Sequence, residues 1–228
     1  MTQIKTRKIA YYAGMVALPA AIGALVGKTK RSALAGSVAG GLTAVAMLGL
    51  RWQLARFFTE QPAYEIEERI GQLEIRRYHP TVMARTRVES NDYDRSLQTG
   101  FKKLAGYIFG DNFNGEKLPM TSPVQTRSND AFVMSFVMPQ GRSLETLPRP
   151  NDIEVELEEV PERRVAVLRF SGRYRGTDVH LHEHALMRMV KRAGLQPMSA
   201  PMFAGFDSPA TIPFLRRNEV WVEVAPHS

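Results

Sequence analysis

The chain of 228 residues contains no cysteine. A disulfide framework, a thiolate metal site and a cysteine nucleophile are therefore excluded. The sequence also lacks the Gly-x-Ser-x-Gly elbow of serine hydrolases and a glycine-rich strand-to-helix loop for phosphate. These absences remove common routes to covalent catalysis and nucleotide binding, and we expect a protein that is not an enzyme.

Acidic side chains are missing from the first 58 positions. Residues 1–58 carry eight of the 30 Lys and Arg residues and none of the 23 Asp and Glu residues, so the formal charge of +7 lies in this segment. Nucleic-acid binding requires a basic patch on the folded domain. Since residues 59–228 are nearly neutral, we expect no nucleic-acid partner. We divide the chain into a basic N-terminal segment, residues 1–58, and a domain, residues 59–228.

The N-terminal segment contains two uncharged runs, residues 9–27 and 32–50. Each run is 19 residues long, which as a helix of 1.5 Å rise per residue spans roughly 28 Å, close to the hydrocarbon thickness of a bilayer. Four residues separate the runs, so we expect a helical hairpin that contacts the membrane through residues 9–50. Glycines four apart, at 23 and 27 and at 36 and 40, would let the two helices approach closely.

Five basic residues flank the termini of this hairpin and three lie in its loop. The positive-inside rule then places residues 59–228 on the cytoplasmic side of the inner membrane of a bacterial cell. Three alternatives stay open. The first run resembles a signal peptide in its basic start and small residues, a single run could span alone, or the second run could lie in the interface or pack as a soluble helix.

The remaining chain alternates between strand and helix patterns. One helix is expected after possible N-caps at residues 90–92 and before Gly110, and a second from a cap at Thr177 or Asp178 to about Ala193. Period-2 alternation of apolar residues predicts short strands at residues 64–68, 73–77, 82–88, 123–126, 132–138, 153–157, 165–170, 202–206 and 220–224.

Two pieces of sequence recur at a near-constant offset. Residues 73–75 (Leu-Glu-Ile) match 153–155 (Ile-Glu-Val), and residues 119–123 (Pro-Met-Thr-Ser-Pro) match 197–201 (Pro-Met-Ser-Ala-Pro). We infer a duplicated strand-strand-helix-strand-strand unit. One unit alone, a sheet with one helix, is too small to bury both faces of the sheet, so the two units should share one hydrophobic core. The expected fold class is α+β: a pseudo-two-fold, distorted antiparallel barrel or sheet with two helices, preceded by the N-terminal helical hairpin.

The segment Lys-Leu-Pro-Met-Thr-Ser-Pro-Val at residues 117–124 is the most distinctive motif of the domain. Together with other segments in the same order, it resembles the SOUL/haem-binding protein family; these segments are residues 64–66, 73–78, 132–139, 167–172 and 216–221. The resemblance implies a pseudo-symmetric fold that binds haem or another tetrapyrrole without catalysis. Residues 1–58 lie outside it.

The resemblance also implies that a porphyrin lies against a helix and a late loop. In this chain the helix is the first one, whose apolar stripe includes Leu97, Phe101 and Leu104, and the loop is residues 206–215. A stripe at helical spacing is equally what any packed helix shows. Residues flanking that stripe, and apolar residues in the loop, where packing gives less reason for them, are better candidates. These are Ile212, Phe214 and Leu215.

Polar partners for haem are also present. His79 follows a strand and precedes Pro80, in a region where some members of the resembled family place an axial histidine, and we name it as a candidate iron ligand. A turn histidine can equally face water. Arg216 and Arg217 could pair with the propionates. Strand alternation places them on opposite faces, so at most one should reach a ligand, and a surface ion pair near Glu219 is the simpler interpretation.

Three histidines lie close together in the second helix. His180 and His184 share a face, as zinc ligands can, whereas His182 points elsewhere. The His-Glu-x-x-His order of zinc hydrolases is absent. We interpret all three as solvated helix residues.

The sequence thus predicts a membrane-anchored, non-catalytic haem or tetrapyrrole binder that sequesters or transfers its ligand. One alternative is a general binder of hydrophobic small molecules. Another is an enzyme acting on a tetrapyrrole or other apolar substrate through a pocket acid such as Glu219 or Glu223.

Overall fold

The computed structural model describes residues 59–90, 92–128, 131–173 and 175–226. The predicted helical hairpin, its alternatives and its orientation fall on residues 1–58, outside this part. Among the described helices, none is both long and apolar enough to cross a bilayer.

The described chain folds as strands, two α-helices and a short 3-10 helix. Four predicted starts are shifted by two residues or more. The strands expected from residues 165 and 220 begin at Arg163 and Asn218. The second helix begins at Gly176 with Arg175 as N-cap and no side-chain cap, not at Thr177 or Asp178. The strand expected from Ile153 begins at Val155, because Asp152 accepts hydrogen bonds from the amides of the next residues and turns the chain. The elements are β1 (Tyr64–Ile70), β2 (Leu73–Tyr78), β3 (Thr81–Val88), α3 (Tyr93–Ile108), β4 (Val124–Ser128), β5 (Phe132–Val137), β6 (Val155–Val160), β7 (Arg163–Phe170), α4 (Gly176–Arg192), β8 (Met202–Gly205), η2 (Pro213–Leu215) and β9 (Asn218–Glu223).

All the strands join one antiparallel sheet of nine strands in the order β1-β2-β7-β9-β8-β4-β5-β3-β6. From β2 to β6 this order is symmetric: exchanging β2, β3, β4 and β5 for β6, β7, β8 and β9 reproduces it in reverse. Each helix follows the equivalent strand, α3 after β3 and α4 after β7. The expected α+β fold, a distorted antiparallel sheet with two helices, is confirmed; its origin by duplication stays a prediction.

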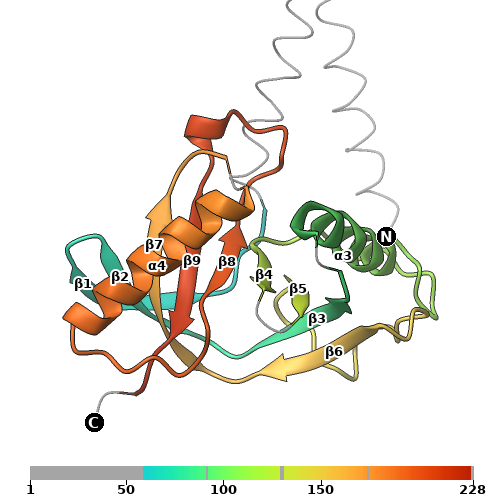
Figure 1. Cartoon of the computed structure of the whole chain (residues 1–228). Helices are drawn as coiled ribbons and strands as arrows, with labels where there is room; N and C mark the ends of the chain where they lie inside the picture. Colours follow the sequence, from blue (N-terminus) through green and yellow to red (C-terminus); the bar gives the residue numbers. More distant parts are fainter. Residues whose placement is uncertain (1–58, 91, 129–130, 174, 227–228) are drawn as a thin grey trace, which may run out of the picture. The chain divides into compact units, whose positions relative to one another are not determined.

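The sheet curls into a half-barrel, with one helix packed against each half (Figure 1). Helix α3 buries Leu104, Tyr107 and Ile108 against β3, β5 and β6. Helix α4 buries Leu186 and Val190 against β7 and β9. We call the side of the sheet that meets the helices the outer face.

The opposite side, which we call the inner face, differs between the two halves. In the half that carries α4, a second layer of buried side chains covers it, including Tyr78, Val165, Phe206 and Trp221. Val220 and Val222 of β9 pack on the α4 side while Trp221 between them packs on the inner side. This half of the sheet is therefore buried on both faces.

Candidate functional site

Residues 206–217, which we call the late loop, connect β8 to β9 and contain η2. Arg216 holds the loop together, since its guanidinium donates to the carbonyls of Thr211 at 2.8 Å and Pro209 at 2.5 Å. A second tie comes from outside, because the amide of Gly172 donates to the Pro213 carbonyl at 2.9 Å. Hydrogen bonds within the late loop and the bond from Gly172 therefore fix its backbone.

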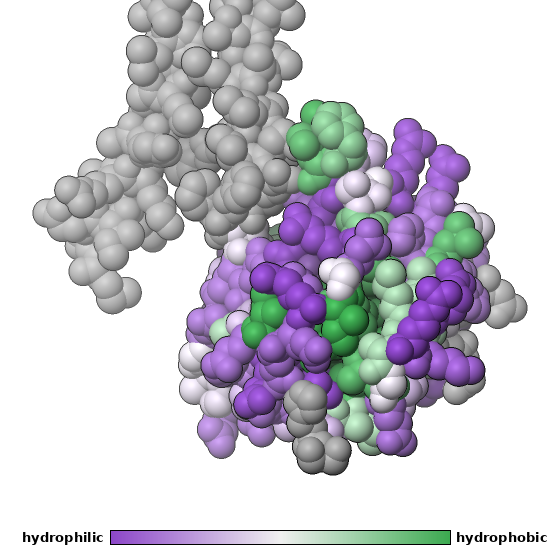
Figure 2. All heavy atoms as spheres, turned by 90° about the vertical axis from the view of Figure 1, so that its left-hand side faces the viewer, coloured by the Kyte–Doolittle hydropathy of each residue, from purple (hydrophilic) through white to green (hydrophobic). Residues whose placement is uncertain are grey.

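The apolar side chains of this fixed loop face solvent. The exposed fractions are 42% for Ile212, 73% for Phe214 and 40% for Leu215. Figure 2 shows a hydrophobic group projecting at the top of the domain, where Figure 1 places η2. Soluble proteins seldom leave contiguous large apolar groups exposed on a rigid loop without a binding role.

The two arginines after η2 are engaged within the protein. Arg216 binds the loop carbonyls described above. Arg217 lies with its guanidinium carbon 3.8 Å from the centre of the Phe206 ring and donates from Nε to Glu219 at 2.9 Å. Its amide also donates to Asp207 at 2.6 Å. Their contact with propionates stays a prediction. In this arrangement Arg216 binds carbonyls of the late loop, and Arg217 binds the buried Glu219 that supports it.

The late loop lies at the same end of the domain as the start of both helices. Gly172, which binds Pro213, precedes α4, and a Cβ on Gly176 would lie 3.4 Å from the ring of Tyr93 at the start of α3. Two exposed arginines, Arg173 and Arg175, lie on the segment between these contacts. Sequence reasoning missed both, although their position after the Phe-Ser-Gly turn could have indicated them.

The three predicted residues of α3 differ in accessibility. Phe101 is 43% exposed and touches Phe136 edge to face at 5.5 Å between ring centres. Leu97 packs at the margin of the core. Leu104 is fully buried, so in this conformation only Phe101 and Leu97 have surface to offer a ligand.

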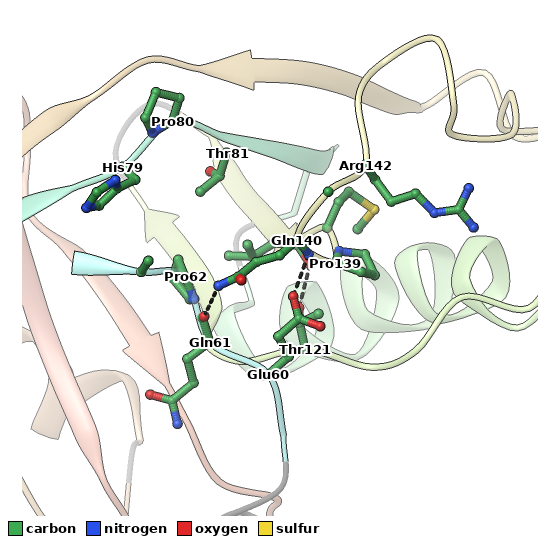
Figure 3. Close-up of a pocket in the computed structure, with 14 residues that line it drawn as sticks. Glu60, Gln61, Pro62, His79, Pro80, Thr81, Thr121, Pro139, Gln140 and Arg142 are labelled. Carbon is green, nitrogen blue, oxygen red and sulfur yellow. Dashed lines mark hydrogen bonds between the residues drawn. The ribbon is translucent and has the colours of Figure 1, made fainter.

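His79 lies apart from the late loop, at the rim of a small cavity of about 160 Å³ (Figure 3). Its side chain is half-exposed and 3.9 Å from Glu65. The cavity is closed below by Glu60, which accepts from the amide of Gln140, and by Gln140, which donates to the Gln61 carbonyl at 3.2 Å. Among the described residues no cluster of three or more His, Asp or Glu could hold a metal ion.

His182 is placed differently from the solvated histidine that the sequence suggested. Its ring stacks on Phe170, with 3.7 Å between centres and 12° between planes, and its Nδ1 lies 2.7 Å from the carbonyl of Asp178. A carbonyl only accepts, so Nδ1 carries a proton, and in the neutral ring the lone pair is on Nε2. The signal was present in the sequence: Val179 and Leu186, three residues before and four after, define the buried stripe of α4. His180 instead pairs with Glu183 at 2.9 Å on the exposed face.

A buried charged network supports the late loop from the inner face. Glu219 is fully buried and accepts from Arg76 at 2.9 and 3.1 Å, from Arg217, and from Trp221 Nε1 at 2.7 Å. Burial acts to lower the pKa of Arg76, but the charge of Glu219 outweighs it and raises that pKa. Burial, opposed by Arg76, raises the pKa of Tyr78. The network is rigid and its Glu219 carboxylate is fully paired, so it is a structural support for the late loop and not a free acid.

The cavity beside His79 has a volume of about 160 Å³, and a groove lined in part by β4 and β5 has a volume of about 210 Å³. Both are smaller than the ~300–1,000 Å³ of typical sites for drug-sized ligands. A flat macrocycle would therefore need an open surface. The geometry defines a small α+β binding domain with a rigid, exposed apolar loop.

Comparison with known proteins places that domain in a family. The model of the SOUL heme-binding protein family matches residues 59–223, and the chain belongs to this family. It is similar to Heme-binding protein 2 of Mus musculus, with 32% identity over 177 residues that cover 72% of this chain and 85% of the mouse protein. Heme-binding protein 2 of Homo sapiens is 31% identical over 162 residues, 67% of this chain and 78% of the human protein.

A solved structure shares the fold at low identity. The C-terminal domain of EcmrR superposes with a TM-score of 0.52 and 13% identity, over 68% of this chain and 98% of that domain. This likeness concerns the fold alone.

Proposed function

We propose that this protein binds haem or a related tetrapyrrole, non-covalently and without catalysing a reaction, at the surface formed by the late loop and the start of α3. The observation that carries the proposal is the rigid late loop with its three exposed apolar side chains. Membership of the SOUL family and the names of its relatives support the choice of ligand.

The apolar contact would supply most of the affinity. Burying a fully exposed Phe side chain contributes about 1.5–3 kcal/mol, so covering Phe214, which is 73% exposed, contributes about 1–2 kcal/mol. About 1.4 kcal/mol corresponds to a tenfold change in Kd. Since the loop is already fixed, little ordering cost opposes binding. The exposed Arg173 and Arg175 are suited to pair with propionates at the polar edge of the macrocycle.

Two histidines compete as the axial ligand. The notable feature of His182 is its orientation, because a Nδ1 proton shared with a backbone carbonyl is the arrangement that metal-bound histidines usually have. His79 has no such partner and lies at a cavity away from the late loop. We therefore extend the proposal to iron ligation by His182, with His79 as the rival.

Haemin titration followed by the Soret band tests the proposal, with the full-length protein in lipid nanodiscs and empty nanodiscs as reference. We expect saturation near one equivalent. Phe214→Asp should weaken binding at least tenfold, because it places a charge in the apolar contact. The matched control is Phe113→Asp, which alters an 81% exposed Phe on another loop and should leave binding unchanged.

The axial ligand is tested by the same titration with His182→Ala and His79→Ala. A shifted Soret band in only one variant identifies the ligand, and no shift in either excludes both. Binding no tighter than that of empty nanodiscs would contradict the haem proposal as a whole.

The proposal also includes the membrane. The two uncharged runs and the excess of basic residues near the termini favour a domain tethered through residues 9–50 on the cytoplasmic side of the inner membrane. A tetrapyrrole is itself apolar enough to partition into lipid. A binder tethered at the membrane surface could then take up, hold or hand on its ligand there.

A further inference from the structure

An open groove lies on the inner face, lined mainly by the strands that pack against α3 and also by Arg163, Met202 and Glu223 of β7, β8 and β9. Strand alternation shows the face: Met134 and Phe136 of β5 pack under α3, whereas Val133 and Ser135 beside them line the groove. The groove has a volume of about 210 Å³. The groove therefore lies on the face of the sheet opposite α3, and none of its lining residues belongs to the late loop.

Two donors in β4 lie buried in this groove without an acceptor. They are Nε2 of Gln125 and Nε of Arg127, neither of which has a hydrogen-bond partner among the residues that the structure describes. Gln125 is only 4% exposed, and its other amide atom, Oε1, accepts from Arg163 at 3.4 Å. That contact orients the amide, because a flipped amide would bring two donors together. Buried donors without partners are rare and costly, so the pair indicates an acceptor that binds there.

Three arginines line the groove, and two of them are paired with glutamates. Arg85 pairs with Glu158 at 2.8 Å and Glu156 at 3.2 Å. Arg163 pairs with Glu223 at 3.0 Å. Arg127 forms no ion pair within the part of the chain that the structure describes. The acceptor that the two donors require is therefore best supplied by an anion.

The remaining lining limits the size and nature of that anion. Buried Met83 and Met202 provide apolar walls, and thioether side chains adapt to varied shapes. The groove volume of about 210 Å³ lies below the ~300–1,000 Å³ of typical sites for drug-sized ligands. The ligand is small, with one anionic end and an apolar body.

We propose that this groove binds a small monocarboxylate, aromatic or short-chain aliphatic, as a second site separate from the tetrapyrrole surface. One carboxylate oxygen accepts from Nε of Arg127 and the other from Nε2 of Gln125. The apolar body lies against Met83 and Met202. The site does not depend on haem binding, and it holds or fails independently of the proposed function.

Isothermal titration of benzoate into the full-length protein in nanodiscs tests the site. We expect saturable binding that weakens at least tenfold in Arg127→Met. The matched control is Arg87→Met, which removes an exposed arginine of β3. Arg87 and Arg127 both lie opposite Val133 of β5 in the sheet register, but Arg87 does not line the groove. This control should bind benzoate as the unaltered protein does.

Gln125→Glu provides a second variant that should keep the fold, since the new carboxylate can pair with Arg163. Its charge should repel benzoate and abolish binding. Neutral benzamide should bind at least tenfold more weakly than benzoate, and inorganic phosphate, which has no apolar body, should also bind more weakly. Equal binding of benzoate to the unaltered protein, Arg127→Met and Gln125→Glu, or of benzamide and benzoate, would overturn the proposal, as would no binding at all.

Discussion

Replacement of Glu219 by Gln should destabilise the domain severely. The Glu219 carboxylate is fully buried and is the shared acceptor for Arg76, Arg217 and Trp221. A Gln of the same shape removes the charge and turns one oxygen into a donor facing other donors. Breaking a buried ion pair from one side costs about 3–5 kcal/mol, a large part of the ~5–15 kcal/mol that stabilises a typical domain.

Equilibrium unfolding in urea of residues 59–228 measures this loss. Trp221 reports the transition, since the other of the two tryptophans, Trp52, lies outside this fragment. The matched control is Glu156→Gln, which breaks an ion pair with Arg85. The side chain of Glu156 is 66% exposed and that of Arg85 is 41% exposed. Such pairs contribute about 0–1 kcal/mol, so the control should unfold almost as the unaltered protein does.

A further substitution separates charge from packing. If the loss in Glu219→Gln comes from uncompensated cations, adding Arg76→Met should recover part of it, because one of those cations is gone. If the loss comes from packing, the second substitution should only add to it. A loss below about 1 kcal/mol for Glu219→Gln, equal to the exposed control, would refute the idea that this network stabilises the inner face.

Two further predictions concern acid stability and membrane side. Burial acts to raise the pKa of Glu67, but its bonds to Arg164 and Arg77 outweigh this and hold it below 4.5. The stability that Glu67 contributes should therefore be present above pH 4.5 and lost as the pH falls through the lowered pKa, and Glu67→Gln should flatten this acid limb in urea titrations; an unchanged limb would contradict it. Because the chain lacks cysteine, Ile153→Cys places its sole thiol at a 94% exposed site. An impermeant maleimide should label it in inverted inner-membrane vesicles and not in intact spheroplasts, and the reverse pattern would place the domain outside.

The strands were predictable because their signal is local. In β7, Val165 to Leu168 form an apolar run that reads directly as a buried strand, and all four are buried. The start of α4 was not predictable, because no side chain caps it and it lies beside Tyr93, far away in sequence, whose ring would be 3.4 Å from a Cβ on Gly176. Local patterns describe elements, while tertiary contacts decide where some of them begin.

The candidate site shows the same division. Exposure of Ile212, Phe214 and Leu215 followed from their position in a loop, and the structure places all three at the surface. The ion pair of Arg217 with Glu219 followed from their spacing, although Glu219 is buried and not at the surface. The role of Arg216 did not follow, because it depends on loop carbonyls that only the folded chain brings together. Glu219 meets Arg76 across 143 residues of sequence, a separation at which no periodic pattern carries information.

Because the strand order is symmetric, the inner face of one half of the sheet can be compared strand by strand with that of the other half. β8 and β9 contribute Ala204 and Trp221 to a closed apolar layer, whereas their counterparts β4 and β5 contribute Gln125 and Ser135 to an open polar groove. Apolar side chains at these positions of β4 and β5 would bury the face and stabilise the fold. Polar side chains there, including buried donors without acceptors, cost stability and bring no packing benefit. Buried donors that find no acceptor among the described residues, beside an open groove, are best explained by a ligand, which is why we place the second site there.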